Sequence, residues 1–140
     1  MSARFLINIL LGFSFAACLL AFVRGGKPER IGAVAILLNL FAGMANEANG
    51  QDPVIGLAID AVTALGLLPV AIRYPRGWVG VVMILYGLQF SLHAWYAVMN
   101  KPRDMLHVQL NNINFMSINA CLAIGAVMAW RRRLQTGSAD

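Results

Sequence analysis

The distribution of apolar and polar positions divides the sequence into five long apolar segments. They cover residues 5–23, 31–48, 53–72, 78–99 and 108–130. Each is close to the roughly 20 residues that an α-helix needs to cross about 30 Å of hydrocarbon, since each residue adds about 1.5 Å. The connecting segments are too short for other structure, so consecutive helices must be antiparallel. The pattern predicts one all-α domain, residues 1–140, folded as a polytopic integral membrane helical bundle.

The segment 31–48 is the weakest of the five as a membrane span, and a four-span alternative would omit it. The segment contains Asn39, Asn46 and several glycines. Omitting it would divide the basic clusters of the chain between the two sides of the membrane, against their usual preference for one side. The five-span interpretation is therefore favoured.

Polar residues recur on one face of most of the expected helices, at steps of three and four residues. These residues are Asn39 and Asn46 in 31–48, Asp60 and Thr63 in 53–72, Tyr86, Gln89, His93, Tyr96 and Asn100 around 78–99, and His107, Asn111, Asn114 and Cys121 around 108–130. One-sided polarity on four helices indicates that their apolar faces contact lipid and their polar faces contact one another.

The composition supports a lipid bilayer as the main partner of the chain. Hydrophobic residues make up 59% and charged residues 12%, whereas a soluble domain carries about 25% charged residues. A net charge of +5 would suggest nucleic-acid binding in a soluble protein. The sequence has no basic patch interleaved with aromatic residues, so we expect no nucleic-acid partner.

The positions of the basic residues predict the orientation of the bundle. Eight of the eleven fall in three clusters that the five spans place on one side: Arg24, Lys27 and Arg30; Arg73 and Arg76; and Arg131, Arg132 and Arg133. Basic residues favour the cytoplasmic side. The N-terminus is then outside, the C-terminus and a polar tail at 134–140 are inside, and the chain is a multi-pass protein of a bacterial-type inner (plasma) membrane. Interfacial aromatic residues are expected at both boundaries, with Trp78 and Trp130 at the inner one and Trp95 and Tyr96 at the outer one.

Two other interpretations of the N-terminal segment and the cysteines are disfavoured. A signal peptide cleaved at Cys18 would leave apolar sequence running on to Val23 and would place Arg24 and the basic residues after it outside. Cys18 and Cys121 both lie within apolar segments and show no metal-ligand spacing. We expect both to be small buried apolar side chains rather than a disulfide or ligands.

The candidate functional residues lie in the outer half of the predicted bundle. Asp60 lies seven residues into its span and His93 lies seven residues before Asn100, so the two share a depth. Ionisable groups in a span usually face the protein interior or a wet cavity. The ligand-binding or proton-handling candidates are Asp60, His93, Glu47, His107, Asn46, Gln89, Tyr86, Tyr96, Asn111 and Asn114. The inner half is expected to be nearly all apolar, apart from Asn39 and Thr63 near the middle.

The Asp60 and His93 pair has three interpretations at this stage. It can handle protons or bind a ligand, it can be a structural hydrogen bond that fixes the bundle, or the helices can be rotated so that the two never meet. The asparagines, taken singly, are common interhelical contacts worth roughly 0.5–2 kcal/mol each. Glu47, Asp60, His93 and His107 are ligand types that a divalent ion accepts. No recognised spacing supports a metal, so no metal and no cofactor are expected.

Three classes of function remain open on the sequence. The first is a protein that binds or helps to translocate a small polar solute, an ion or a proton, which with five spans would form a homo-oligomer. The second is an accessory subunit of a larger membrane complex, or an oligomeric pore of the holin type. The third is a membrane-embedded acid–base enzyme, such as an isomerase or cyclase, acting on a lipophilic substrate through an Asp–His pair. The catalytic residues of such an enzyme cannot be named from the sequence.

Overall fold

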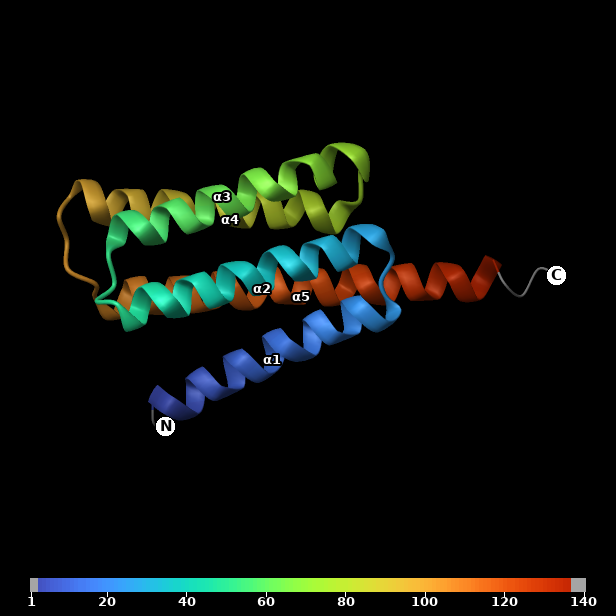
Figure 1. Ribbon diagram of the computed structural model, residues 1–140, viewed down its shortest axis with the longest axis horizontal. Coiled ribbons are helices and arrows are strands. Elements are labelled where there is room, and N and C mark those ends of the chain that lie inside the picture. Colours follow the sequence, from blue (N-terminus) through green and yellow to red (C-terminus); the bar gives the residue numbers. More distant parts are fainter. Residues whose placement is uncertain (1–2, 137–140) are drawn as a thin grey trace.

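A computed structural model of the chain describes residues 3–136 and contains five α-helices and no strands in that range. The helices are α1 (Ala3–Arg24), α2 (Lys27–Ala48), α3 (Pro53–Arg73), α4 (Gly77–Val98) and α5 (Met105–Thr136) (Figure 1). All five are long and apolar enough to cross a membrane. The all-helical prediction and the count of five such helices are therefore confirmed.

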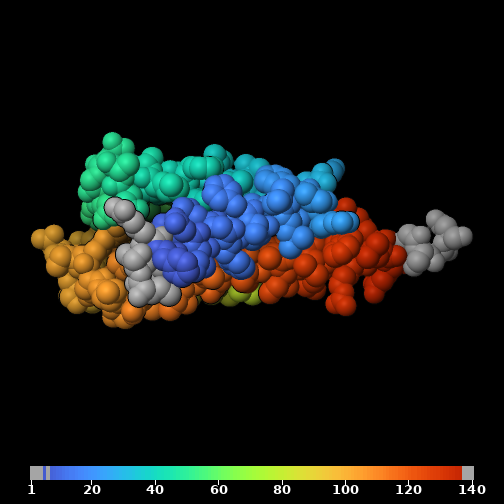
Figure 2. All heavy atoms as spheres, turned by 90° about the horizontal axis from the view of Figure 1, so that it is seen from below, coloured from blue at the N-terminus to red at the C-terminus, as the bar shows by residue number. Residues whose placement is uncertain are grey.

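The helices form a ring in chain order, closed by contact between α1 and α5. Each helix packs against the next, and α2 also contacts α5 across the ring. Within the described residues, α1 contacts neither α3 nor α4. Figure 1 shows the α3–α4 pair on one side of the α2–α5 pair and α1 on the other. Figure 2 shows α1 lying across α2 and α5, so α1 completes one wall of the bundle.

The two ends of the bundle differ in chemistry, and we name them for it. The polar end holds the connections 49–52 and 99–104, and the basic end holds the connections 25–26 and 74–76 and the last turns of α5. At the polar end, the Asp52 carboxylate caps α3 by accepting from the N–H groups of Val54 and Ile55. Gly50, with a φ of +101°, makes the reversal that leads into this cap.

The outward faces of the helices are apolar. Large hydrophobic side chains are exposed on every helix, among them Ile72 at 74% and Val98 at 83%. α5 continues through Thr136, so the first residues of the predicted tail are helical, and the remaining ones lie outside the described range. Apart from this extension of α5, the helix ends lie within two residues of the predicted bounds, except that α2 begins at Lys27 rather than at residue 31 and α5 begins at Met105 rather than at residue 108.

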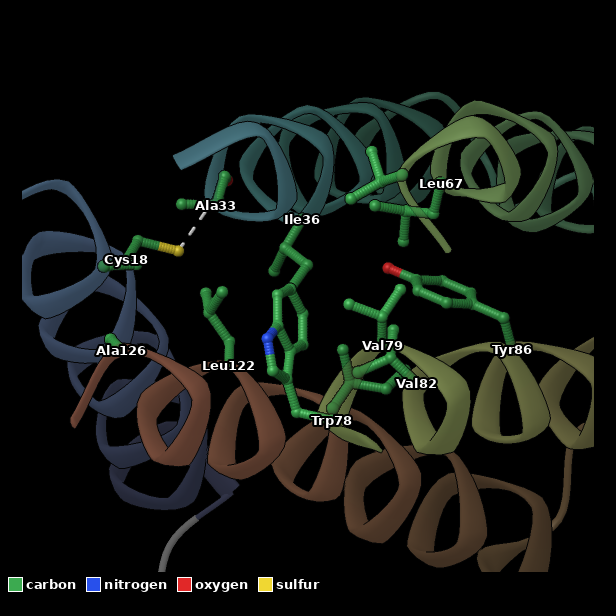
Figure 3. Close-up of a cluster of buried hydrophobic side chains, with 13 residues drawn as sticks. Cys18, Ala33, Ile36, Leu67, Trp78, Val79, Val82, Tyr86, Leu122 and Ala126 are labelled. Carbon is green, nitrogen blue, oxygen red and sulfur yellow. Dashed lines mark hydrogen bonds between the residues drawn. The ribbon is translucent and has the colours of Figure 1, made fainter. Parts of the chain in front are cut away.

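The apolar core is organised around Trp78, which begins α4 and points between α2 and α5 (Figure 3). A Cβ added at Gly32 would lie 2.9 Å from the Trp78 ring, and one added at Gly125 would lie 2.6 Å from it. These two glycines leave the space that the indole fills. Trp78 and Tyr96, which we expected at the two boundaries of the membrane, are both buried, so neither ring faces outward as an interfacial residue would.

A buried acidic residue at the basic end corrects a second prediction. Glu29 lies in the first turn of α2 and is 0% exposed. Its Oε1 accepts from the Arg76 guanidinium at 2.5 Å and from the Trp78 indole N–H at 3.0 Å, and its Oε2 accepts from the Gly26 N–H at 2.8 Å. The expectation that this half of the bundle is nearly all apolar is therefore wrong at Glu29. The carboxylate is buried because a cation and two N–H donors satisfy it.

Gly125→Ala is expected to lower the free energy of unfolding in detergent by about 1–3 kcal/mol, because the added methyl group overlaps the Trp78 ring. The matched control is Gly66→Ala in α3, where a Cβ would meet nothing within 4 Å. That variant is expected to be neutral or slightly stabilising, because alanine favours helix. Titration with a denaturing detergent measures both. Equal stability of the two variants would contradict the packing of Trp78 described above.

Candidate functional site

Asp60 is the centre of a polar network that three helices build. It lies on the inward face of α3 and is 3% exposed. Its Oδ1 accepts from the Asn39 side-chain amide of α2 at 3.1 Å and from the Gln89 side-chain amide of α4, also at 3.1 Å. The same Asn39 amide donates to the Thr63 hydroxyl at 3.0 Å. The one-sided polar stripes of α2, α3 and α4 therefore meet at this carboxylate.

His93 stands beside Asp60, as expected from their matched depth. Its Nδ1 lies 3.0 Å from Asp60 Oδ2, and its Nε2 lies 3.2 Å from Asn111 Oδ1 of α5. The first contact has the distance of an ion pair but not the angles of a hydrogen bond, so Oδ2 has no hydrogen-bond donor within the described residues. Each ring nitrogen of His93 thus faces an oxygen, one of the Asp60 carboxylate and one of the Asn111 side-chain amide.

Gln89 links Asp60 to the fifth helix. Its Oε1 accepts from the Asn114 side-chain amide at 2.7 Å, and the same amide donates to the Leu85 carbonyl at 3.0 Å. Gln89 thus donates to the carboxylate on one side and accepts from α5 on the other. The network runs without interruption from α2 to α5, which fixes the orientation of the amide donors around Asp60.

His107 continues the site toward the polar end. Its ring stacks on His93 with centroids 5.1 Å apart and meets the Tyr96 ring edge-on at 4.4 Å. It is 3% exposed, and its Nδ1 has no hydrogen-bond partner among the described residues. A buried nitrogen without a partner is costly in a static bundle. It therefore marks a place where a bound group would be stabilised.

Asp104, which the sequence analysis did not single out, positions this part of the site. Its Oδ1 accepts from the Tyr96 hydroxyl at 2.6 Å and from the His107 backbone N–H at 2.8 Å. These two hydrogen bonds lower the pKa of Asp104. The signal was available in the sequence, because an aspartate just before an apolar segment is typical of a helix cap. Asp104 ties the start of α5 to the end of α4.

A cavity of about 460 Å³ opens beside Asp60 and is lined by residues of all five helices. Its polar wall includes Asp60 and His93, and residues of α1 supply an apolar wall, namely Ile7, Leu10 and Leu11. Ligand cavities commonly measure about 300–1,000 Å³. The cavity is therefore large enough for a small molecule with both polar and apolar parts.

The predicted site residues divide into three groups by position. The cavity beside Asp60 is lined by Asp60, His93, Glu47, His107, Asn46, Gln89 and Asn111. Tyr96 lines a second cavity at the polar end. Asn114 acts through Gln89, and Tyr86 packs in the apolar core around Trp78, so neither lines either cavity. In the described range, no three His, Cys, Asp or Glu side chains are grouped as they would be to hold a metal ion.

No protein-family model matches the chain, and neither a curated protein nor a solved structure is significantly similar to it.

Gln89→Leu is expected to lower the free energy of unfolding by about 1–3 kcal/mol, because Asp60 Oδ1 loses a donor and the Asn114 amide loses an acceptor. The matched control is Gln109→Leu, the same chemical change at an exposed position of α5. Detergent denaturation compares the two. If Gln109→Leu were as destabilising as Gln89→Leu, the network around Asp60 would contribute nothing specific.

Proposed function

We propose that the chain is a multi-pass protein of a bacterial-type inner membrane. We further propose that it binds, or helps to translocate, a small polar solute, an ion or a proton in the cavity beside Asp60. The N-terminus lies outside, the C-terminus lies inside, and the cavity opens away from the cytoplasm. The observation that carries the binding function is the buried Asp60 carboxylate, which lines a cavity of about 460 Å³ and whose Oδ2 accepts no hydrogen bond from any of the described residues.

The membrane location is supported by where charged and apolar side chains fall. Apolar side chains cover the outward faces of all five helices, which in water would expose far more apolar surface than a monomeric protein tolerates. The basic clusters lie at one end, and Glu47, Asp52 and Asp104 lie at the other. The basic end is then cytoplasmic by the positive-inside rule.

The binding function is supported by the contrast between what Asp60 has and what a buried carboxylate needs. Its neighbours are two amide donors on Oδ1 and His93 beside Oδ2. None of these is a permanent cation, so a proton, an ion or a cationic group of a solute would complete the site. A carboxylate that served only to fix the bundle would be expected to have its hydrogen bonds filled by the protein.

A membrane-embedded acid–base enzyme is the second candidate function. It is favoured by the distance of 3.0 Å between His93 Nδ1 and Asp60 Oδ2 and by the apolar wall from α1, which suits a lipophilic substrate. Tyr86, one of the predicted ligand-binding or proton-handling candidates, packs in the core and is not part of this pair. Assembly into a homo-oligomer or a larger complex is compatible with either function and is part of the proposal.

Asp60→Asn is expected to lower the occupancy of a small polar ligand that co-purifies with the protein by about tenfold, because the amide carries no charge. Native mass spectrometry in detergent measures the occupancy and the oligomeric state together. The control is Ser14→Ala, which removes another buried interhelical hydrogen bond, to Asn119, in a residue that lines neither cavity. If both variants lose stability alike and occupancy does not change, Asp60 is a structural residue and the proposal is wrong.

The proposed orientation predicts which ends of the bundle accept a membrane-impermeant maleimide. Gln51→Cys at the polar end is expected to react in intact spheroplasts, and Thr136→Cys at the basic end only after permeabilisation. The parent chain gives the background, because Cys18 is buried and Cys121 is partly buried. Labelling of Thr136→Cys alone in intact spheroplasts would mean that the orientation is the reverse of the one proposed. Labelling of both variants would contradict the odd number of spans between the two positions.

A further inference from the structure

A second cavity, of about 410 Å³, adjoins the cavity beside Asp60 at the polar end. The two share lining residues from α2, α3, α4, α5 and the connections, namely Asn46, Gln51, Gly56, His93, Arg103 and His107. The first cavity reaches down to Asp60, and the second reaches the connection 99–104. Together they provide a passage from the polar end to the buried carboxylate.

Opposite charges stand at different depths of these joined cavities. Asp60 is buried at the deep end, whereas Arg103 is exposed and lines both cavities. Among the described residues, the ion pairs are Glu29 with Arg76 and Asp60 with His93, so Arg103 has no carboxylate partner there. The other cationic side chain near the polar-end opening of the cavities is Lys101, whose Nζ lies 4.8 Å from the centroid of the Trp95 ring. Arg103 is therefore the cation best placed to receive an anionic group.

The carboxylates near the polar-end opening of the cavities accept hydrogen bonds from neighbouring residues. Glu47 Oε1 accepts from the Gln51 side-chain amide at 2.7 Å. Asp52 caps α3, and Asp104 accepts from Tyr96 and His107. None of them forms an ion pair with Arg103 within the described residues. Arg103 thus places a positive charge near the polar-end opening, whereas the Asp60 carboxylate lies deeper in the joined cavities.

Two residues that line the cavities, Asp60 and His107, each have one atom with unmet hydrogen-bonding capacity. Asp60 Oδ2 lacks a donor, and His107 Nδ1 lacks any partner within the described part of the chain. The rings of His93 and His107 stack, so these atoms belong to adjoining parts of one polar wall. The opposite wall carries the aliphatic side chains of Ile7, Leu10 and Leu11.

From this arrangement we propose that the joined cavities bind a small zwitterion with an apolar side chain, such as an aliphatic α-amino acid. Its ammonium group donates to Asp60, its carboxylate accepts from the Arg103 guanidinium and from His107 Nδ1, and its side chain contacts the α1 wall. A ligand with both charges leaves no net charge in the cavity, and burying a pair costs far less than burying one charge alone. The inference rests on the proposed function, because it names the class of solute for the same site.

The test compares three probes against the purified full chain in lipid nanodiscs by isothermal titration calorimetry. Leucine carries both charges, leucinamide carries only the cation, and N-acetylleucine carries only the anion. Leucine is expected to bind at least about tenfold more tightly than either analogue. Arg103→Gln is expected to weaken the binding of leucine by about tenfold and to leave the binding of leucinamide unchanged. Asp60→Asn is expected to weaken the binding of both.

Arg131→Gln is the matched control, because it makes the same change at an exposed arginine of the basic end, outside both cavities. It is expected to bind leucine like the parent chain. Arg103 is exposed, so its variant should fold, and thermal unfolding checks this. Equal affinity for leucine and leucinamide, with no effect of Arg103→Gln, would overturn the proposal that the ligand is a zwitterion. The proposed binding function at Asp60 would still stand.

Two other results would also overturn the proposal. The first is that N-acetylleucine binds more tightly than the other two probes. The second is that no probe binds at millimolar concentration, while native mass spectrometry shows that the Asp60→Asn variant has lost a different ligand. Leucine binding that is unchanged in Asp60→Asn would overturn the proposed function as well, because the deep carboxylate would then take no part.

Discussion

The burial of Glu29 at the basic end is the constraint on which the rest of the bundle depends. The carboxylate cannot leave water unless its charge is paired and its oxygens accept hydrogen bonds. Arg76, the Trp78 indole and the Gly26 N–H meet that requirement, and in doing so they join the start of α2 to the start of α4. The Trp78 ring then has to lie between α2 and α5, which Gly32 and Gly125 allow. Three helices are thereby held in close contact at one end, and the cavities occur toward the other.

The two buried carboxylates show why only one of them is a candidate for function. Glu29 has a guanidinium partner and donors on both oxygens, so a ligand would have to displace existing bonds. Asp60 has amide donors on one oxygen only, and its other oxygen faces a histidine whose charge depends on a proton. The first arrangement is closed and the second is incomplete. Incomplete polar burial is tolerated where water or a solute can complete it, and the adjoining cavity provides that space.

The sequence predicted the helices well because their signal is long and repeated, whereas the packing details depend on shapes that hydropathy does not encode. The matched depth of Asp60 and His93 made them candidate partners, with a rotated arrangement in which they never meet left open, and the structure places them 3.0 Å apart. Glu29 was missed because the charges around it made the start of α2 resemble a cytoplasmic loop. Trp78 was misplaced because its amphipathic ring suits an interface, and nothing local shows that two distant glycines open a slot for it. Tyr86 shares the stripe of Gln89 and His93 but lies about two turns from His93, at the level of the core rather than of the cavity.

α1 supplies the aliphatic wall of the cavity beside Asp60, and its contacts with the rest of the bundle explain why it adds no charge there. It contacts only α2 and α5 within the described residues. Its buried hydrogen bonds to them run from the Ser14 hydroxyl to Asn119 and from the Cys18 thiol to the Ala33 carbonyl. Neither bond reaches the Asp60 network, so α1 contributes aliphatic side chains to the cavity and no charge. The polar wall, in contrast, is fixed by hydrogen bonds among the other four helices. A cavity whose polar wall is rigid and charged at both depths, and whose other wall is aliphatic, discriminates by charge first and by side-chain shape second. An amphiphilic solute meets both walls, whereas an ion or a proton uses only the polar one.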